Sequence, residues 1–285
     1  MKKVLLFGAS GNLGRKIAAE LKTRGFQTTA VVRNQAKADA LAGWVENCVI
    51  ANVTKPDQLE NICDGFEVVV SSLGKSVSPN DKSRASFYDI DFKANNYILR
   101  EARNARVKKF VYVSALGAEK YPKLAYFKTH QDFSEKLINS DLNYSIIKPP
   151  AIFSAFLDLI ELARKGRLIN IGQGRGRTNP IYEGDLARVC VDSIAEANAV
   201  IEAGGKEILT RREINEIIQR AVAPDKKIRN VPLAFFKMGL PLTKVFDRNA
   251  FDKFAFFTEV VQHDTLAPQI GELRLEEYIK SIPDL

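Results

Sequence analysis

The sequence predicts an α/β fold, with a doubly wound parallel sheet followed by a smaller, mainly helical C-terminal part. Short apolar runs typical of buried strands alternate with segments of helical spacing along the first half of the chain. A glycine-rich turn directly follows the first of these runs, and after Pro149 and Pro150 the alternation gives way to helical spacing. Because strands that alternate with helices form parallel sheets covered on both faces, these three observations favour a layered α/β unit.

The expected elements follow in chain order. Buried apolar runs predict strands at residues 4–8, 28–32, 45–53, 68–72, 110–114 and 144–148. Helical spacing, clearest at Leu13, Ile17 and Leu21, predicts helices at residues 13–24, 35–41, 58–63, 87–106 and 129–140. Beyond the two prolines we expect helices at 156–165 and 184–197, a strand at 206–210 that returns to the sheet, and a mainly helical tail from residue 211.

Composition and charge exclude several classes of protein. Hydrophobic residues make up 46% of the 285 residues and charged residues 27%, which is typical of a globular chain and excludes a fibrous or mostly disordered one. The net charge is +8, but basic residues are spread among acidic ones, so we expect no nucleic-acid partner. The apolar runs are too short to span a membrane. Three cysteines without a C-x-x-C pair and only two histidines predict no metal site and a cytoplasmic location.

The glycine-rich turn at residues 8–14 has the features of a phosphate-binding loop. Gly8 permits a tight turn, Gly11 lets the backbone approach a pyrophosphate, and Gly14 allows a helix and a strand to pack closely. The start of the following helix adds free N–H groups and the positive end of its dipole. We therefore expect a dinucleotide to bind at Gly8, Ser10, Gly11, Asn12, Leu13 and Gly14.

This G-x-x-G-x-x-G spacing resembles the short-chain dehydrogenase/reductase superfamily in its extended and atypical branches. The resemblance continues to about residue 200 through the segments 52–57, 70–74, 109–115, 145–150 and 179–187, and is greatest to the atypical, NmrA-like group of NAD(P)-binding proteins. It implies a Rossmann-like sheet. It also implies further cofactor contacts at Asn52, Val53, Ser72, Leu73, Gly74, Lys128, Pro149 and Pro150.

The expected domain organisation follows from this resemblance and from the change of pattern at the two prolines. Residues 1–150 are expected to form the Rossmann dinucleotide-binding core, to which residues 181–210 return. Residues 151–180 and 211–285 are expected to form a substrate-capping part. Seven of the 17 Phe residues fall within 232–257. They could form the core of a helical subdomain, line an apolar substrate pocket, or make weak contact with a membrane surface.

The second expected strand ends in Arg33 and carries no acid there. An Asp or Glu at this place would accept a hydrogen bond from the ribose 2′-hydroxyl of NAD(H). Arg33 can instead pair with the 2′-phosphate of NADP(H), with Arg15 and Lys37 nearby. We therefore expect NADP(H), with NAD(H) as the alternative.

The superfamily's usual catalytic groups are a Tyr, a Lys four residues later and a Ser. The resemblance places the Ser at Ser114 and the Lys at Lys128, but the Tyr position then falls on Leu124. Tyr126 is two residues from that position, and residues i and i+2 of a helix point to different faces. Lys128, Ser114 and Tyr126 are the catalytic candidates, whereas His130 is expected at the surface.

Several functions remain open at this point. NmrA-like relatives that reduce phenolic or enone substrates work with a Lys at this place and without the Tyr. The resemblance thus favours an NADPH-dependent oxidoreductase that reduces a small enone, carbonyl or quinone-like molecule. The alternatives are a non-catalytic NADP(H)-binding sensor or regulatory protein, and a sugar-nucleotide epimerase or dehydratase. The sequence names neither the substrate nor the oligomeric state.

Overall fold

The computed structural model describes residues 2–283, with the backbone alone at residues 239–242 and 245. Its centre is a parallel sheet of seven strands in the order β3-β2-β1-β4-β5-β6-β9. These strands are β1 (Lys3–Phe7), β2 (Gln27–Val32), β3 (Asn47–Ile50), β4 (Val68–Ser71), β5 (Lys109–Val113), β6 (Asn143–Lys148) and β9 (Ala199–Glu202). The winding reverses between β1 and β4, which is where open α/β sheets bind their ligands.

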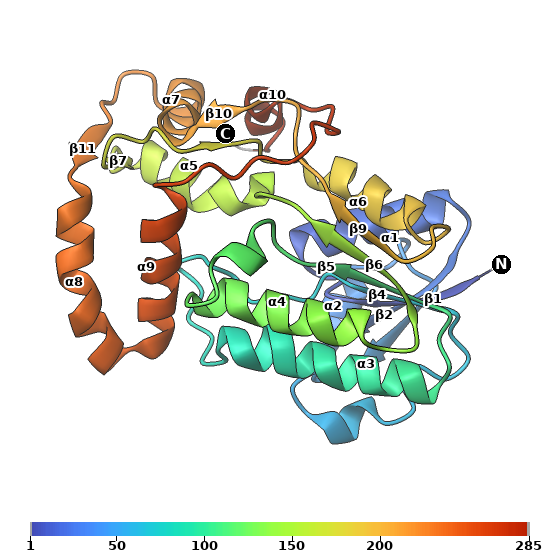
Figure 1. Cartoon of the computed structure of the whole chain (residues 1–285). Coiled ribbons are helices and arrows are strands. Elements are labelled where there is room, and N and C mark those ends of the chain that lie inside the picture. The colour runs from blue at the N-terminus through green and yellow to red at the C-terminus, as the bar shows by residue number, and fades with distance from the viewer. Residues whose placement is uncertain (1, 284–285) are drawn as a thin grey trace.

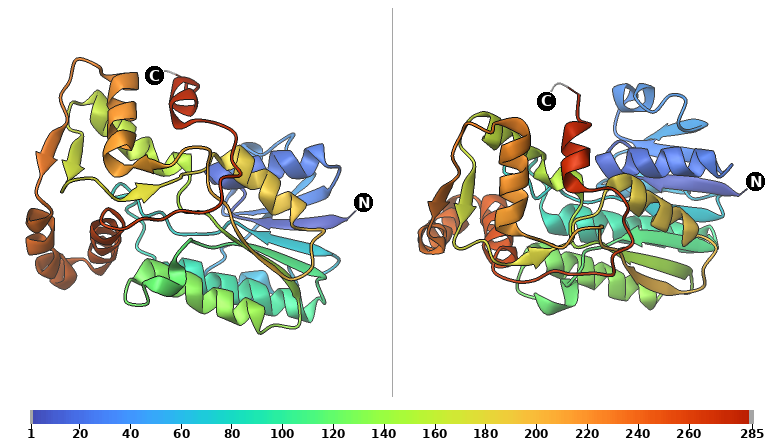
Figure 2. Two further views of the ribbon diagram at one scale, coloured as in Figure 1. Left: turned by 45° about the horizontal axis from the view of Figure 1, so that its top comes forward. Right: turned by 90° about the horizontal axis from the view of Figure 1, so that it is seen from above.

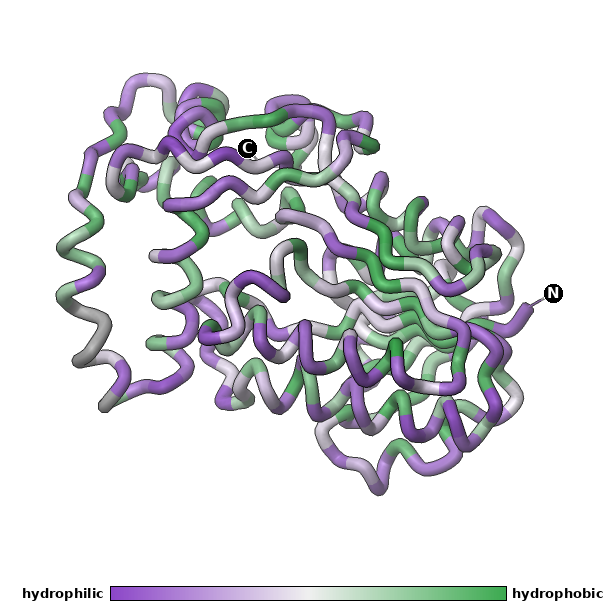
Figure 3. The backbone as a smooth tube through the Cα atoms, in the orientation of Figure 1, coloured by the Kyte–Doolittle hydropathy of each residue, from purple (hydrophilic) through white to green (hydrophobic). Residues whose placement is uncertain are grey.

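Helices cover both faces of the sheet (Figure 1), as a doubly wound fold requires. On one face, α1 (Asn12–Thr23), α2 (Gln35–Asp39) and α6 (Glu183–Asp192) pack on the sheet around one buried apolar cluster. On the other, η1 (Pro56–Leu59), η2 (Tyr88–Ala94), α3 (Asn95–Asn104) and α4 (Ala125–Ile138) enclose a second cluster. Figure 3 shows the resulting pattern, with the central strands mostly green and the outer helices alternating between purple and green.

The C-terminal part lies beyond the carboxyl edge of the sheet, the edge at which the parallel strands end (Figure 2). Its buried cluster joins α5, α7 and α10. Its elements are η4 (Phe153–Phe156), α5 (Leu157–Arg164), β7 (Ile169–Ile171), β8 (Arg177–Thr178), β10 (Leu209–Thr210), α7 (Arg211–Val222), β11 (Arg229–Val231), α8 (Leu233–Phe246), α9 (Arg248–Val260) and α10 (Leu275–Lys280). A short 3₁₀ turn, η3 (Ala118–Lys120), lies between β5 and α4.

The sheet's last strand is not the one expected at residues 206–210. Leu209 and Thr210 pair with β8 in a separate two-stranded sheet, while β9 extends the central sheet. Strand β9 lies at the edge of the sheet, its apolar run at residues 199–201 is short, and Val200 is 49% exposed. Three helices also differ from expectation. The segment 56–59 is a 3₁₀ turn, the helix near 87–106 opens with a π-helical segment, and α4 begins at Ala125, four residues early.

Candidate cofactor and catalytic site

The glycine loop between β1 and α1 is closely packed against the end of β4. Gly8 has a φ of +77°, and a Cβ there would lie 2.7 Å from the carbonyl carbon of Ser72. The backbone N–H of Gly11 donates to the Gly8 carbonyl oxygen at 3.0 Å, which closes the turn. At Gly14 a Cβ would lie only 2.1 Å from the same carbonyl oxygen. Gly8 and Gly14 are therefore positions at which a side chain would disrupt the loop.

The loop leaves the start of α1 open to an anion. Helix α1 begins at Asn12, and Gly11 before it offers no side chain to cap the first N–H groups. The first turn carries no acidic residue, so the positive end of the helix dipole is not neutralised locally. A Cβ on Gly11 would approach only the Gly8 carbonyl oxygen, at 3.3 Å. These features fit a pyrophosphate group, and the residues present are therefore suited to a dinucleotide.

Arg33 lies directly after β2 with its side chain exposed. Within residues 2–283 the Arg33 side chain makes no hydrogen bond or ion pair, and neither does that of Arg15. The neighbouring Asn34 is already engaged, because its Oδ1 accepts from the backbone N–H of Lys37 at 3.1 Å and caps α2. Arg33 is thus a cation available to a ligand phosphate.

The other residues expected at the cofactor lie along the same edge of the sheet. After β3, Asn52 Oδ1 accepts from both the N–H and the Oγ1 of Thr54, and Val53 is buried in the second cluster. After β4, Ser72 Oγ donates to the Phe7 carbonyl at 3.2 Å, and Leu73 and Gly74 follow. Pro149 and Pro150 follow β6, and the Pro149 carbonyl accepts from the backbone N–H of Leu116.

Ser114 and Lys128 do not meet in this structure. Ser114 is 4% exposed, and its Oγ lies 3.2 Å from the Oγ of Ser134 between β5 and α4. The side chain of Lys128 is 57% exposed, and its Nζ donates to both carboxylate oxygens of Asp132, at 2.7 and 2.9 Å. Lys128 therefore belongs to the solvent face of α4, and its ammonium is held in an i,i+4 ion pair there.

The face of α4 turned towards the sheet carries a different set of polar groups. Tyr126 and His130 are four residues apart, hence on one face, with ring centroids 4.7 Å apart. His130 Nδ1 lies 2.7 Å from the hydroxyl oxygen of Tyr112 on β5. Its Nε2 lies 3.3 Å from Oδ1 of Asp91, which η2 presents. The expectation that His130 lies at the surface is wrong, because only 4% of it is exposed.

Burial controls the protonation of this polar cluster. It lowers the pKa of His130 to about 3, so the ring is neutral near pH 7. Burial raises the pKa of Asp91 well above its usual range, against an opposing effect of the backbone N–H of Lys75. The phenols of Tyr126 and Tyr112 also have raised pKa values, first because they are buried and then because Asp91 is near. Among residues 2–283 no group forms a hydrogen bond with the Tyr126 hydroxyl.

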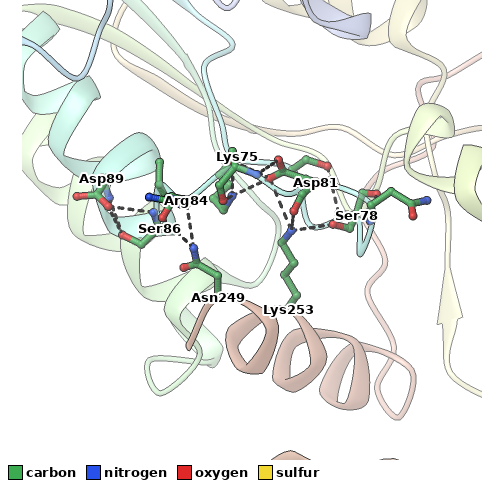
Figure 4. A network of polar contacts seen from close by, with 12 residues as sticks. Lys75, Ser78, Asp81, Arg84, Ser86, Asp89, Asn249 and Lys253 are labelled. Carbon is green, nitrogen blue, oxygen red and sulfur yellow. Dashed lines mark hydrogen bonds and ion pairs between the residues drawn. The ribbon is translucent and has the colours of Figure 1, made fainter. Parts of the chain in front are cut away.

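A loop at residues 75–86 runs from β4 towards η2 and is fastened to α9 by buried charges (Figure 4). The Nζ of Lys75 lies 2.7 Å from Oδ2 of Asp81 and donates to the Oγ of Ser83 at the same distance. From α9, the Nζ of Lys253 donates to the carbonyls of Ser78 and Asp81 at 2.8 and 2.7 Å. These contacts attach the loop to α9 beside the carboxyl edge of the sheet.

The Phe-rich segment at residues 232–257 contributes to this edge through one of its members. Phe256 on α9 makes an edge contact with the Tyr126 ring, with centroids 4.6 Å apart. Phe235 and Phe246 on α8 are 67% and 85% exposed. None of the seven belongs to the buried cluster of the C-terminal part. A hollow of about 420 Å³ lies between residues 79–84 and α9.

Neither a metal site nor a membrane span emerges from the described residues. In that part of the chain no three His, Cys, Asp or Glu side chains are grouped as ligands for a metal ion. No helix there is long and apolar enough to cross a bilayer.

Comparison with known proteins places this geometry in a family. The chain matches the model of the NAD(P)H-binding family over residues 8–197. It is 26% identical to the photosystem II assembly factor Ycf39 of Cyanophora paradoxa, over 90% of this chain and 81% of that protein. It is 28% identical to the chloroplastic divinyl chlorophyllide a 8-vinyl-reductase of Arabidopsis thaliana, over 96% of this chain and 72% of that protein.

Two solved structures share the fold. An NADPH-dependent quinone oxidoreductase of Escherichia coli, complexed with NADPH, has a TM-score of 0.69 at 22% identity and covers 97% of this chain and 98% of its own. A nucleoside-diphosphate-sugar epimerase of Staphylococcus aureus has a TM-score of 0.74 at 18% identity, with coverage of 99% and 100%. The family match, together with the glycine loop and the parallel sheet, shows that the chain belongs to the NAD(P)H-binding family.

Proposed function

We propose that this protein is an NADPH-dependent reductase of a small enone, carbonyl or quinone-like molecule, with Tyr126 as the proton donor. The observation that carries the proposal is the position of Tyr126. It is the second residue of α4, at the carboxyl edge of the sheet, and its hydroxyl has no hydrogen-bond partner among residues 2–283. The partly buried Tyr126 phenol has a raised pKa and stays protonated near pH 7, so its proton is available to a substrate oxygen.

The cofactor's place in this proposal follows from the loop and from Arg33. The start of α1 would hold the pyrophosphate, and the exposed guanidinium of Arg33 would pair with a 2′-phosphate, which favours NADP(H) over NAD(H). When bound, NADPH supplies the hydride. Ser72, Leu73, Gly74, Pro149 and Pro150 remain proposed neighbours of the cofactor, because they follow strands at the same edge.

The same geometry supports a lesser role for Lys128 than the resemblance implies. Its ammonium is paired with Asp132 on the solvent face of α4, and Ser114 is buried against Ser134. Tyr126 instead lies under Phe256 and beside Phe87, whose ring centroid is 5.5 Å away. Aromatic neighbours of this kind exclude water and suit a flat, apolar substrate.

A comparison of two substitutions on α4 tests the proposal. NADPH oxidation is first followed with a panel of simple quinones and enones, beginning with 1,4-benzoquinone. Tyr126→Phe, which removes only the hydroxyl, should lower kcat/KM by about 10² or more, the scale of losing a positioned acid. Lys128→Met should change it less than about threefold. Tyr121→Phe is the matched control, because Tyr121 stacks on Phe127 nearby and should keep its activity. A collapse of activity in Lys128→Met with Tyr126→Phe intact would refute this assignment.

A non-catalytic role is the second candidate. It is favoured by Ser114, which is turned into the protein interior and hydrogen-bonded there. It is also favoured by the similarity to a protein named as an assembly factor. Such a protein would bind NADPH tightly and oxidise it with none of the panel. The predicted surface contact through residues 232–257 belongs with this candidate, and the exposed Phe235, Met238 and Phe246 support it. Flotation with anionic lipid vesicles, compared between the wild type and Phe235→Ser, tests that contact.

A further inference from the structure

The proposed reduction of a substrate beside Tyr126 makes no use of the hollow between residues 79–84 and α9. Its volume is about 420 Å³, and pockets for small molecules commonly measure about 300–1,000 Å³. One wall of the hollow is the loop. The other is the face of α9 that carries Asn249, Lys253 and Phe257, which are spaced by four residues. The hollow is therefore large enough to hold a small molecule.

Polar contacts join the two walls of the hollow (Figure 4). From α9, the Nδ2 of Asn249 donates to the carbonyl of Arg84 at 3.0 Å. The ammonium of Lys253, which is 5% exposed, donates to the carbonyls of Ser78 and Asp81. Because these contacts engage the backbone of the loop, they leave the side chain of Arg84 free. The hollow has both its walls only while the loop is attached to α9.

The charged groups that the hollow offers to a ligand are mainly cations. The carboxylate of Asp81 is already bound by a lysine ammonium at 2.7 Å, and that of Asp247 caps the start of α9. Lys82 and Arg84 line the hollow, and their side chains make no hydrogen bond or ion pair within residues 2–283. A free guanidinium is suited to a carboxylate, sulfonate or phosphate group, which it binds through parallel hydrogen bonds.

Helix α9 adds aromatic surface to the hollow. Phe254 and Phe257 line it, and neither belongs to a buried apolar cluster of the described residues. Phe254 is 38% exposed. Such rings pack favourably on flat apolar groups, in offset or edge-on contact. The hollow thus combines cations for a charged group with ring surface for an apolar body.

We propose that this hollow binds a small aromatic anion, with its charged group on Lys82 and Arg84 and its rings on Phe254 and Phe257. Such a ligand contacts both walls, so it binds the protein only while the loop is attached to α9. By mass action, the bound anion increases the population in which the loop is attached. This inference does not rest on the proposed reductase activity, because its tests measure binding and loop opening rather than turnover.

A fluorescent aromatic anion, 8-anilino-1-naphthalenesulfonate, is the probe for the first test. Saturating NADP⁺ is present throughout, so that the dye is kept from the cofactor loop and the cofactor adds no fluorescence. Arg84→Gln should raise the Kd of the dye at least about tenfold, the scale of losing a charge-assisted hydrogen bond. Arg175→Gln is the matched control and should leave the Kd unchanged. Arg175 is also exposed and its side chain is unpaired within residues 2–283, but it does not line the hollow.

Two further titrations test the class of ligand and the place where it binds. N-Phenyl-1-naphthylamine has the same rings without the sulfonate, so it should bind the wild type at least about tenfold more weakly than the dye does. Phe235→Ser removes an exposed ring on α8, outside the hollow, and should leave dye binding unchanged. Dye binding that is lost in Phe235→Ser, or that is unaffected by Arg84→Gln, would overturn the proposal.

Hydrogen exchange tests the effect of the anion on the loop. The amides of Asp81 and Ser83 are hydrogen-bonded within the loop. With the dye at ten times its Kd, they should exchange about tenfold more slowly, because a ligand specific for the attached form favours it by that factor. Amides of α2, which open by local fluctuations elsewhere, should be unaffected. In Arg84→Gln, the same dye concentration should slow the loop amides by about twofold or less. Bound dye with unchanged exchange in residues 76–86 would refute the proposal.

Discussion

The fastening of the 75–86 loop by Lys253 gives a prediction whose size follows from the structure. Lys253 is 5% exposed, and its ammonium donates to two backbone carbonyls of the loop, those of Ser78 and Asp81. It also lies 3.6 Å from the Asp81 carboxylate, which Lys75 binds more closely. Lys253→Met keeps the length and apolar stem of the side chain and removes these contacts.

The expected loss is the sum of two charge-assisted hydrogen bonds, reduced by relief from burying a charge. Each such bond contributes about 1.5–3 kcal/mol. Burial lowers the pKa of Lys253, which indicates that its charge is already costly to bury. The two carbonyls are also part-buried, so water replaces some of the lost bonding. We therefore expect a net loss of about 2–3 kcal/mol, which corresponds to a loop that opens about 30 to 150 times more often.

Hydrogen exchange measured by mass spectrometry reads this opening directly. The amides of Asp81 and Ser83 are hydrogen-bonded within the loop and should exchange faster by the stated factor. Lys280→Met is the control, because the side chain of Lys280 is 66% exposed and pairs with Glu276 at the surface. Its effect should stay below about 0.5 kcal/mol. If exchange in residues 76–86 were within twofold of wild type in Lys253→Met, the reasoning on buried charge would be wrong.

Three further predictions concern the cofactor loop and the acid sensitivity of the protein. Gly14→Ala places a methyl group 2.1 Å from the Gly8 carbonyl oxygen. The affinity for NADPH, measured by fluorescence titration, should therefore fall at least tenfold, and the melting temperature should drop. Unchanged binding would contradict the packing argument. Arg33→Ala should weaken NADPH binding by about 10- to 100-fold and leave NADH binding unchanged, measured by calorimetry; equal losses for both cofactors would exclude a 2′-phosphate contact. Burial alone would raise the pKa of Asp81, but hydrogen bonds from Lys75 and Ser83 lower it overall. The contribution of ionised Asp81 to the free energy of unfolding should therefore be present above about pH 4 and be lost as the pH falls below that. In urea unfolding from pH 5 to 2.5, Asp81→Asn should lose less stability with acid than the wild type.

The fold could be predicted where the local sequence and the global architecture impose the same constraint. Gly14 is required by contacts with Gly8 and Ala9 close by in the chain, and the positive φ of Gly8 is a local requirement of the turn. Strands β1 and β4 are apolar on both faces because helices cover them on both sides. Strand β9 could not be recognised in this way. It lies at the sheet's edge with half of Val200 exposed, and its apolar run at residues 199–201 is only three residues long.

The register of the α4 helix shows why a motif taken from a family can mislead when one of its residues is missing. Anchoring the motif on Lys128 places the tyrosine at Leu124, which is the residue before the helix and has an extended backbone. The helix itself offers a different anchor. Tyr126, His130, Phe133 and Leu137 recur at spacings of three and four and form the face against β5. That pattern places a histidine four residues after a tyrosine, where the superfamily has its lysine. Because a buried, neutral imidazole cannot lower the pKa of Tyr126 as a cation would, the phenol stays protonated near pH 7, as the proposed role of proton donor requires.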